Sequence, residues 1–122
     1  MTLSVLFAVA LGGGLGAVCR AACTNLIKTR WKRSVPLATF CINVSGSFAL
    51  GLLGAAALSA PLSALLGTGF LGGFTTFSTL HVEALTLLRG EAPAAGIGYL
   101  CASYGCGIAA AVAGLTLGAH LL

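Results

Sequence analysis

Apolar residues fill four long stretches of the chain, and polar residues gather in the short segments between them. The stretches cover residues 3–27, 36–58, 64–89 and 94–120. A membrane-spanning helix needs about 20 consecutive, mainly apolar residues, and each stretch is long enough. The pattern therefore predicts an all-α membrane protein, with four transmembrane helices in a single domain that covers residues 1–122.

The third stretch has a centre that is unusual for a membrane-spanning helix. Residues 67–80 hold four glycines, four threonines, one serine and three phenylalanines. Glycine weakens a helix by about 1 kcal/mol relative to alanine, and hydroxyl groups need hydrogen-bond partners where water is absent. Non-helical backbone at membrane depth is tolerated only where protein buries it or where it lines a water-filled cavity. We therefore expect the third helix to be broken near its centre, at Gly72 and Gly73, and to line a site there.

Polar residues in the second stretch lie on one face of the predicted helix. Thr39, Asn43 and Ser47 are each four residues apart, and residues at this spacing face the same way. Asn43 has two alternative roles: it joins two helices, an interaction of about 1 kcal/mol in a bilayer, or it lines a polar pathway. Three polar side chains on one face exceed what helix association needs, which favours the pathway. Tyr99 and Ser103 share a face of the fourth helix in the same way.

The composition agrees with a membrane protein, and the charges predict its orientation. The chain is 58% hydrophobic and 7% charged, whereas soluble domains contain about 25% charged residues. Four of the six cations lie in residues 28–33, which is typical of a membrane-flanking loop rather than of a nucleic-acid-binding surface. With Arg89, the first and third loops hold five cations, and the termini and second loop hold no Lys or Arg. Because cytoplasmic loops carry an excess of Lys and Arg, both termini are predicted to lie outside.

Arg20 lies inside the first predicted span, several residues from its end. Three roles are open to it. Its side chain extends to the lipid headgroups, it caps the end of a neighbouring helix, or it sets a positive potential at the mouth of a vestibule.

The polar groups at membrane depth suit an anion. Asn, Ser, Thr and Tyr side chains supply N–H and O–H donors, and the two carboxylates, Glu83 and Glu91, lie near the ends of predicted helices. A proton-coupled antiporter needs a buried carboxylate, and hydrolytic chemistry needs a nucleophile beside a base; the sequence shows neither. A helical scaffold without transport activity is a further alternative, but its polar residues would be scattered rather than aligned.

Three runs of residues resemble the signatures of the CrcB/Fluc fluoride channels. The runs are residues 12–20, 43–51 and 69–79. The third, Gly-Phe-Leu-Gly-Gly-Phe-Thr-Thr-Phe-Ser-Thr, is the most specific, and the number and order of spans also match. The resemblance implies a channel that exports fluoride passively across the bacterial inner membrane. It also implies a lipid-embedded dimer of antiparallel subunits, with two pores along the subunit interface and a structural Na⁺ at the dimer centre.

The resemblance assigns roles in the pore to individual residues. Asn43 matches the pore asparagine of the family, and Phe77 matches its first pore phenylalanine. Tyr99 and Ser103 match the start of a polar track in the fourth helix. Together with the polar positions around them, these residues form the predicted fluoride pathway: Thr39, Asn43, Ser47, Phe77, Ser78, Thr79, Tyr99 and Ser103.

The resemblance also assigns the sodium site and shows where this chain departs from the family. Gly72 and Thr75 match the positions whose backbone carbonyls hold Na⁺. Leu80 stands where the family has its second pore phenylalanine, and Gly107 stands where other members have a further hydroxyl. The uneven charge is a further departure, because an antiparallel homodimer needs the same chain to insert both ways. The partner is therefore either a second copy of this chain or an oppositely oriented paralogue.

Overall fold

Helices make up nearly all of the structure. The computed structural model describes residues 2–31 and 36–122, and these residues contain no β-strand, so the all-α prediction is confirmed. In chain order the helices are α1 (Leu3–Arg30), α2 (Leu37–Ala55), α3 (Ala60–Ser63), η1 (Ala64–Leu71), α4 (Gly72–Phe74), α5 (Phe77–Arg89) and α6 (Pro93–Leu121). Of these, η1 is a π-helix.

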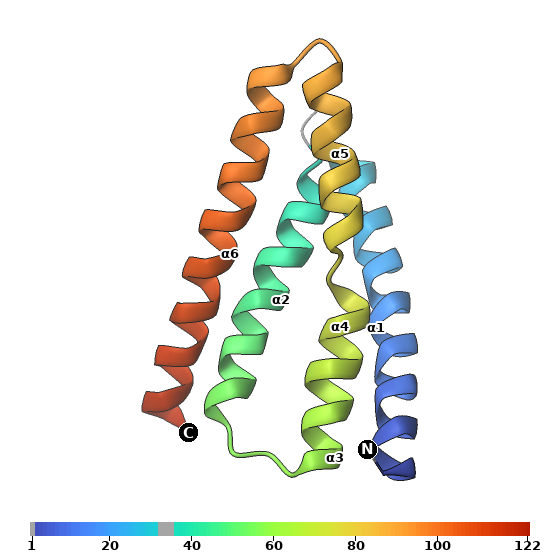
Figure 1. Cartoon of the computed structure of the whole chain (residues 1–122), viewed down its shortest axis with the longest axis vertical. Coiled ribbons are helices and arrows are strands. Elements are labelled where there is room, and N and C mark those ends of the chain that lie inside the picture. The colour runs from blue at the N-terminus through green and yellow to red at the C-terminus, as the bar shows by residue number, and fades with distance from the viewer. Residues whose placement is uncertain (1, 32–35) are drawn as a thin grey trace.

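Three of the described helices, α1, α2 and α6, are long and apolar enough to cross a membrane. Residues 64–89, predicted as one further span, instead form two helical pieces, η1–α4 and α5. Together these pieces run from one end of the bundle to the other (Figure 1). Each piece alone is shorter than the roughly 20 residues that cross a bilayer. The third predicted helix is therefore interrupted near its centre, as the sequence predicts.

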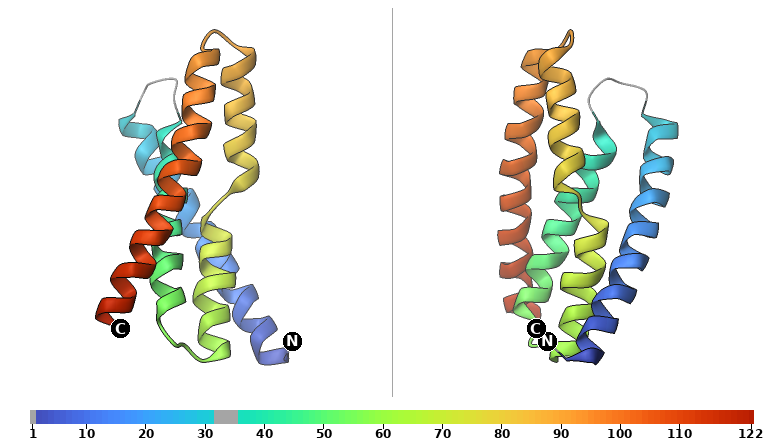
Figure 2. Two further views of the ribbon diagram at one scale, coloured as in Figure 1. Left: turned by 60° about the vertical axis from the view of Figure 1, so that its left-hand side comes forward. Right: turned by 45° about the vertical axis from the view of Figure 1, so that its right-hand side comes forward.

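The interruption lies where the chain changes neighbours. Figure 2 shows α1 and α6 on opposite sides of the bundle, with α2 and η1–α4 between them. η1 and α4 pack on α1, whereas α5 packs on α6, which also packs on α2. The two termini lie at one end of the bundle, and the turn between α5 and α6 lies at the other (Figure 1).

Glycines allow two pairs of helices to approach to backbone contact. Gly16 of α1 lies against the carbonyl group of Phe70 in η1, and Gly114 of α6 lies against that of Phe48 in α2. A Cβ atom at either glycine would overlap that backbone. Gly12 and Gly16 are both buried, and their four-residue spacing is the one that lets helices pack closely in lipid.

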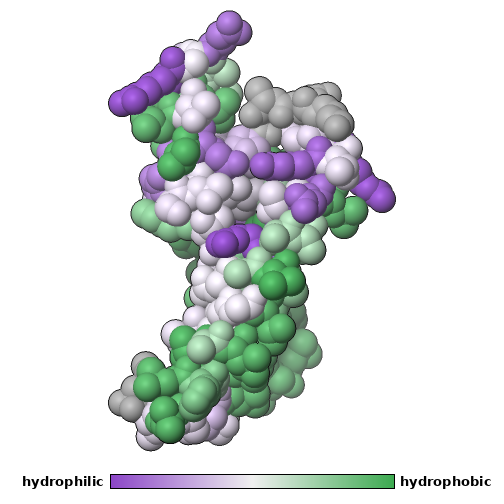
Figure 3. Space-filling model, turned by 90° about the vertical axis from the view of Figure 1, so that its right-hand side faces the viewer, coloured by the Kyte–Doolittle hydropathy of each residue, from purple (hydrophilic) through white to green (hydrophobic). Residues whose placement is uncertain are grey.

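Hydrophilic and hydrophobic surfaces are separated along the bundle (Figure 3). Hydrophilic residues gather in the half that holds the α5–α6 turn, and the opposite half is mainly hydrophobic. Lys28 and Arg30 lie in the last turn of α1, and Arg89 lies in the last turn of α5. These three cations of the predicted basic side therefore lie in the same half. The other two, Lys32 and Arg33, lie outside the described residues.

Candidate functional site

The break between α4 and α5 consists of two residues, Thr75 and Thr76. Both have extended backbone, with φ −82° and ψ 160° at Thr75 and φ −147° and ψ 118° at Thr76. The Thr76 hydroxyl accepts a hydrogen bond from the Thr79 amide over 3.4 Å and forms the N-cap of α5. Threonine suits these positions, because β-branched side chains favour extended backbone and a hydroxyl can cap a helix.

The expected position of the break, at Gly72 and Gly73, is wrong. Both glycines belong to α4 and are helical. Gly73 provides room instead, since a Cβ atom there would overlap the backbone of Gly13 in α1. Gly73 thus allows close helix packing, and the two threonines that follow α4 carry the break.

Asn43 of α2 holds both backbone groups of Thr76. Its Nδ2 donates to the Thr76 carbonyl and its Oδ1 accepts from the Thr76 amide, each over 2.8 Å. Backbone groups that a break removes from helical bonding need such partners, because leaving them unpaired in a buried site costs free energy. Asn43 therefore joins two helices, the first of its two alternatives. Its amide has a second N–H, so a role in the ion pathway stays a prediction.

Arg20 of α1 binds the other residue of the break. Its Nη1 donates to the Thr75 carbonyl over 3.5 Å, and Thr75 is the C-cap residue of α4. A cation at the C-terminal end of a helix interacts favourably with the helix dipole. Of the three roles considered for Arg20, this contact supports the capping of a neighbouring helix end. A role at a vestibule stays a prediction.

A groove of about 560 Å³ lies beside the break and is lined by α2, η1–α4, α5 and α6. The surface of the groove is mainly apolar, and none of the described residues that line it is a carboxylate. Binding sites commonly have this character, with apolar walls and a few placed polar groups. Six predicted site residues meet in it: Asn43, Ser47, Gly72, Thr75, Phe77 and Ser103.

Ser103 has an unusual environment in the groove wall. The residue is only 7% exposed, and its hydroxyl is the one buried side-chain polar group without a hydrogen-bond partner among the residues that the structure describes. Leaving a buried group unpaired costs about 1–3 kcal/mol. A water molecule or a ligand in the groove would supply the missing hydrogen bond.

Five predicted site residues lie outside the groove: Arg20, Thr39, Ser78, Thr79 and Tyr99. Thr39 of α2 and Tyr99 of α6 are buried, and the Tyr99 hydroxyl donates to Oε1 of Glu83 in α5 over 3.2 Å. Ser78 and Thr79 are exposed in the first turn of α5. A single chain therefore does not gather all the predicted pathway residues on one surface.

Leu80, which the sequence resemblance matches to the family's second pore phenylalanine, is a packing residue in this chain. It is 5% exposed and forms a cluster with Ala84, Leu87 and Tyr99. The leucine also borders the groove. Its main contacts therefore stabilise the packing of α5 on α6.

Comparison with known proteins shows the family of the chain. A family model described as CrcB-like protein, Camphor Resistance (CrcB), matches residues 7–115. The chain belongs to the CrcB-like family. This CrcB-like protein is similar to Fluoride-specific ion channel FluC 1 of Listeria monocytogenes serotype 4b (strain F2365), with 44% identity over 110 residues, 90% of this chain and 93% of the relative.

Two further relatives of this CrcB-like protein have similar coverage. Fluoride-specific ion channel FluC 1 of Ligilactobacillus salivarius (strain UCC118) is 47% identical over 90% of this chain and 96% of the relative. Fluoride-specific ion channel FluC 2 of Rhodococcus jostii (strain RHA1) is 48% identical over 89% of this chain and 94% of the relative. The resemblance seen in the three sequence runs is confirmed. The family is one of ion channels and not of enzymes, and with three helices fit to span a membrane the chain is a multi-pass membrane protein.

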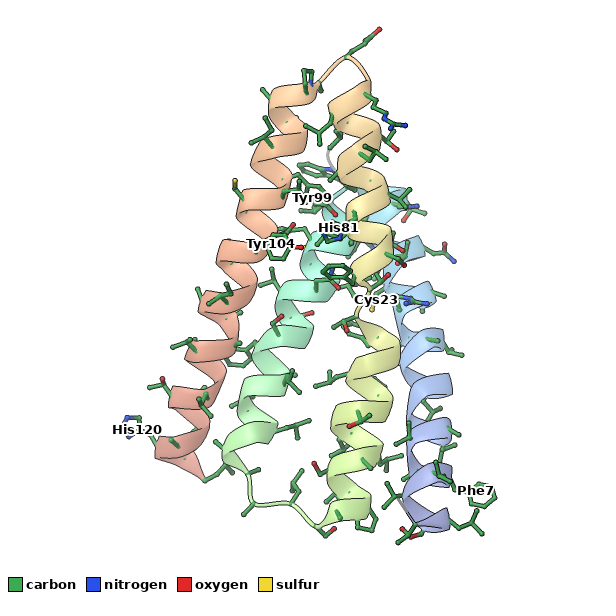
Figure 4. The ribbon with its side chains drawn as sticks, viewed as in Figure 1. Phe7, Cys23, His81, Tyr99, Tyr104 and His120 are labelled. Atoms are coloured by element: carbon green, nitrogen blue, oxygen red, sulfur yellow. The ribbon has the colours of Figure 1, made fainter. Side chains whose placement is uncertain are left out.

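Two residues at the groove of this CrcB-like protein were not predicted: Tyr104 of α6, which lines it, and His81 of α5, which contacts Tyr104. The Tyr104 hydroxyl lies 2.7 Å from Nε2 of His81. Figure 4 shows both side chains between α5 and α6 near Tyr99, whereas His120 lies at the far end of α6. The four-residue spacing of Phe77 and His81 indicated that these two could touch, but nothing in the sequence shows that Tyr104 faces α5.

Proposed function

We propose that this protein is a fluoride-selective passive ion channel that exports fluoride from the bacterial cytoplasm across the inner membrane. Relatives named as fluoride-specific ion channels match 89–90% of the chain, which supports transport of the same ion. The observation in this chain that carries the proposal is the buried Ser103 hydroxyl. It is a hydrogen-bond donor without a partner in the wall of a groove.

The other groups in the groove also suit an anion. Moving a small ion from water into a medium of low dielectric constant costs on the order of 20 kcal/mol in the ideal case, so fixed donors have to replace water. Asn43 has an N–H beyond the one that Thr76 uses. Phe77 lines the groove and is 69% exposed, and the edge of an aromatic ring is its positive part.

The predicted pathway residues outside the groove would extend the pathway at its two ends. Tyr99 lies four residues before Ser103 and therefore on the same face of α6. Thr39 lies four residues before Asn43 and therefore on the same face of α2. At the other end, Ser78 and Thr79 present exposed hydroxyls directly after Phe77.

A second subunit would close the pathway. The Phe77 ring lines the groove but is largely exposed in the single chain. Lipid can cover apolar surface, but an ion pathway has to be enclosed by protein or water. We therefore place the chain in an antiparallel dimer, either with a second copy or with an oppositely oriented paralogue.

The backbone carbonyls of Gly72 and Thr75 are suited to hold a structural Na⁺ in that dimer. The Thr76 amide, four residues after Gly72, donates to Asn43 and is not available to the Gly72 carbonyl. Thr75 has left the helix. Carbonyls of unwound backbone coordinate Na⁺ in membrane proteins, and two per chain leave further positions to a second subunit. The bound ion would supply a fixed positive charge, beside the guanidinium of Arg20.

Fluoride efflux tests the proposed function. The purified full-length protein is placed in lipid vesicles loaded with potassium fluoride, and external fluoride is followed with an ion-selective electrode after addition of a potassium ionophore. We expect rapid fluoride release and no comparable release of chloride from vesicles loaded with potassium chloride. Vesicles that release no fluoride, or that release chloride as fast, would show that the proposal is wrong.

Phe77→Ile tests the place of the pathway in the same assay. Isoleucine keeps an apolar side chain but has no ring edge, so we expect fluoride release to be lost while the protein still elutes as a folded species. Phe7→Ile is the matched control, because Phe7 is 68% exposed on α1 and Phe77 is 69% exposed on α5. Normal release by the Phe77 variant would remove this residue from the pathway.

A further inference from the structure

The Phe77 ring stands at the groove with little protein around it. Phe77 is the first residue of α5, directly after the break, and it is 69% exposed although it lines the groove. A side chain in such a position occupies several rotamers unless a neighbour restrains it. His81, one helical turn later, is such a neighbour.

His81 contacts both the ring and the backbone of Phe77. The centroids of the two rings are 4.1 Å apart, and their planes are inclined by 37°. Nδ1 of His81 lies 2.9 Å from the Phe77 carbonyl oxygen. Because a carbonyl only accepts hydrogen bonds, Nδ1 carries the proton and donates it. In the neutral imidazole the other nitrogen, Nε2, is then an acceptor.

Tyr104 of the neighbouring helix α6 donates a hydrogen bond to Nε2. Its hydroxyl lies 2.7 Å from Nε2 of His81 and donates to it. Its ring meets the imidazole edge-on, with centroids 5.9 Å apart and planes inclined by 63°. Both nitrogens of the imidazole are therefore bonded, and the ring is held between α5 and α6 (Figure 4). The two hydrogen bonds and the two ring contacts together fix the orientation of the imidazole.

We propose that His81 and Tyr104 are positioning residues that hold the Phe77 ring in the wall of the ion pathway. The inference rests on the proposed function, since it deepens the role of Phe77 in that pathway. A ring with one face held against the imidazole presents its positive edge to the groove, whereas a freely rotating ring would also present its negative face. The pair thus keeps the ring in the orientation that an anion needs.

The orientation of the ring can be measured without transport. Full-length protein with 4-fluorophenylalanine at position 77 is placed in lipid vesicles and observed by ¹⁹F NMR. We expect one narrow resonance, which broadens or shifts in His81→Ala and in Tyr104→Phe. His120→Ala is the control, because it changes the other histidine, at the far end of α6, and should leave the resonance unchanged. A resonance that neither His81→Ala nor Tyr104→Phe alters overturns the proposal.

Fluoride efflux measures the consequence for transport. Tyr104→Phe keeps the ring and removes only the hydroxyl, so we expect the rate to fall about threefold, and His81→Ala should lower it about tenfold, the range that one or two lost hydrogen bonds produce. Because Tyr104 acts through His81, the double variant should be no slower than His81→Ala. Wild-type rates in both single variants, or effects that multiply in the double variant, overturn the proposal.

The two measurements separate failure of this inference from failure of the proposed function. If the wild-type protein releases no fluoride, the proposed function is wrong, and the ¹⁹F resonance still shows whether the pair restrains the ring. If the wild-type protein transports fluoride but the resonance is the same in all variants, only the positioning role is wrong.

Discussion

Asn43 and Ser103 line the same groove, but their side chains are satisfied to different degrees. Asn43 makes two hydrogen bonds to the backbone of Thr76, and the Ser103 hydroxyl makes none within the protein. Removing a satisfied buried group leaves its partners unpaired, whereas removing an unsatisfied group leaves nothing behind. Substitutions at these two residues should therefore affect stability and transport in different proportions.

Asn43→Asp is expected to abolish fluoride release and to lower the melting temperature. A carboxylate still accepts from the Thr76 amide, but it cannot donate to the Thr76 carbonyl, and an unpaired buried group costs about 1–3 kcal/mol. It also places a negative charge in the wall of an anion pathway. The control is Asn25→Asp, at an exposed position of α1. Release at the wild-type rate would exclude Asn43 from the pathway, and an unchanged melting temperature would contradict its role at the break.

Ser103→Ala should reduce transport without reducing stability. The lost hydroxyl has no partner in the protein, so the melting temperature should stay the same or rise, whereas fluoride release should fall by about tenfold, as expected for one lost hydrogen bond to an ion. The control is Ser45→Ala, whose hydroxyl donates to the Ile42 carbonyl of its own helix over 3.1 Å. A lower melting temperature with unchanged release would show that the Ser103 hydroxyl is structural.

At the scale of the helices, the break and the glycines together allow residues 64–89 to pack on two different helices. The chain from η1 to α5 first packs on α1 and then on α6, and one straight helix would have to follow a single neighbour. Two extended threonines allow the change of neighbour. Glycines in α1 then let η1–α4 approach closely enough for Arg20 to reach the Thr75 carbonyl.

Gly16→Ala tests the contact between α1 and η1. A Cβ atom at Gly16 would overlap the backbone of Phe70, and forcing extra atoms into a packed contact costs about 1–3 kcal/mol. We expect a lower melting temperature and a smaller yield of monodisperse protein in detergent. Gly14→Ala is the matched control on the same helix, because a Cβ atom there would have no neighbour within 4 Å. Equal stability of the two variants would contradict the close contact.

At the scale of the whole molecule, charge and topology point to one orientation in the membrane. Both termini lie at one end of the bundle (Figure 1), and the cations that end α1 and α5 lie in the other half (Figure 3). Loops with many Lys and Arg residues stay in the cytoplasm. Our hypothesis is that this chain inserts mainly with its termini outside, which would favour an oppositely oriented paralogue as the partner.

A protease-cleavable tag at the C-terminus tests this orientation. Protease added to spheroplasts, in which the outer membrane is opened and the inner membrane is intact, should remove the tag from nearly all copies. Replacing the four cations of residues 28–33 with glutamine should make the population mixed, because it removes most of the charge difference. A tag that is cleaved in about half of the unmodified copies would mean dual insertion, and would favour the homodimer.

Much of the fold and part of the site could be predicted from local features. Apolar stretches of sufficient length indicated membrane helices, and the glycines and hydroxyls of residues 67–80 indicated a break, because helix propensity and hydrogen-bonding needs belong to each residue wherever it packs. The i to i+4 spacing also placed Asn43 and Ser47 on one face, and both line the groove.

The remaining features depend on which helices pack together, and only the tertiary structure decided them. Whether the break fell at the glycines or at Thr75 and Thr76 depended on α1, whose backbone takes up the space beside Gly73, and on Asn43, which holds the Thr76 backbone. The burial of Leu80 and the pairing of His81 with a tyrosine 23 residues away depend on how α5 meets α6. The sequence by itself therefore determined a helical membrane protein with one broken helix, since these are local properties. The partners of the polar groups came from the packing, because contacts between helices have no fixed spacing along the chain.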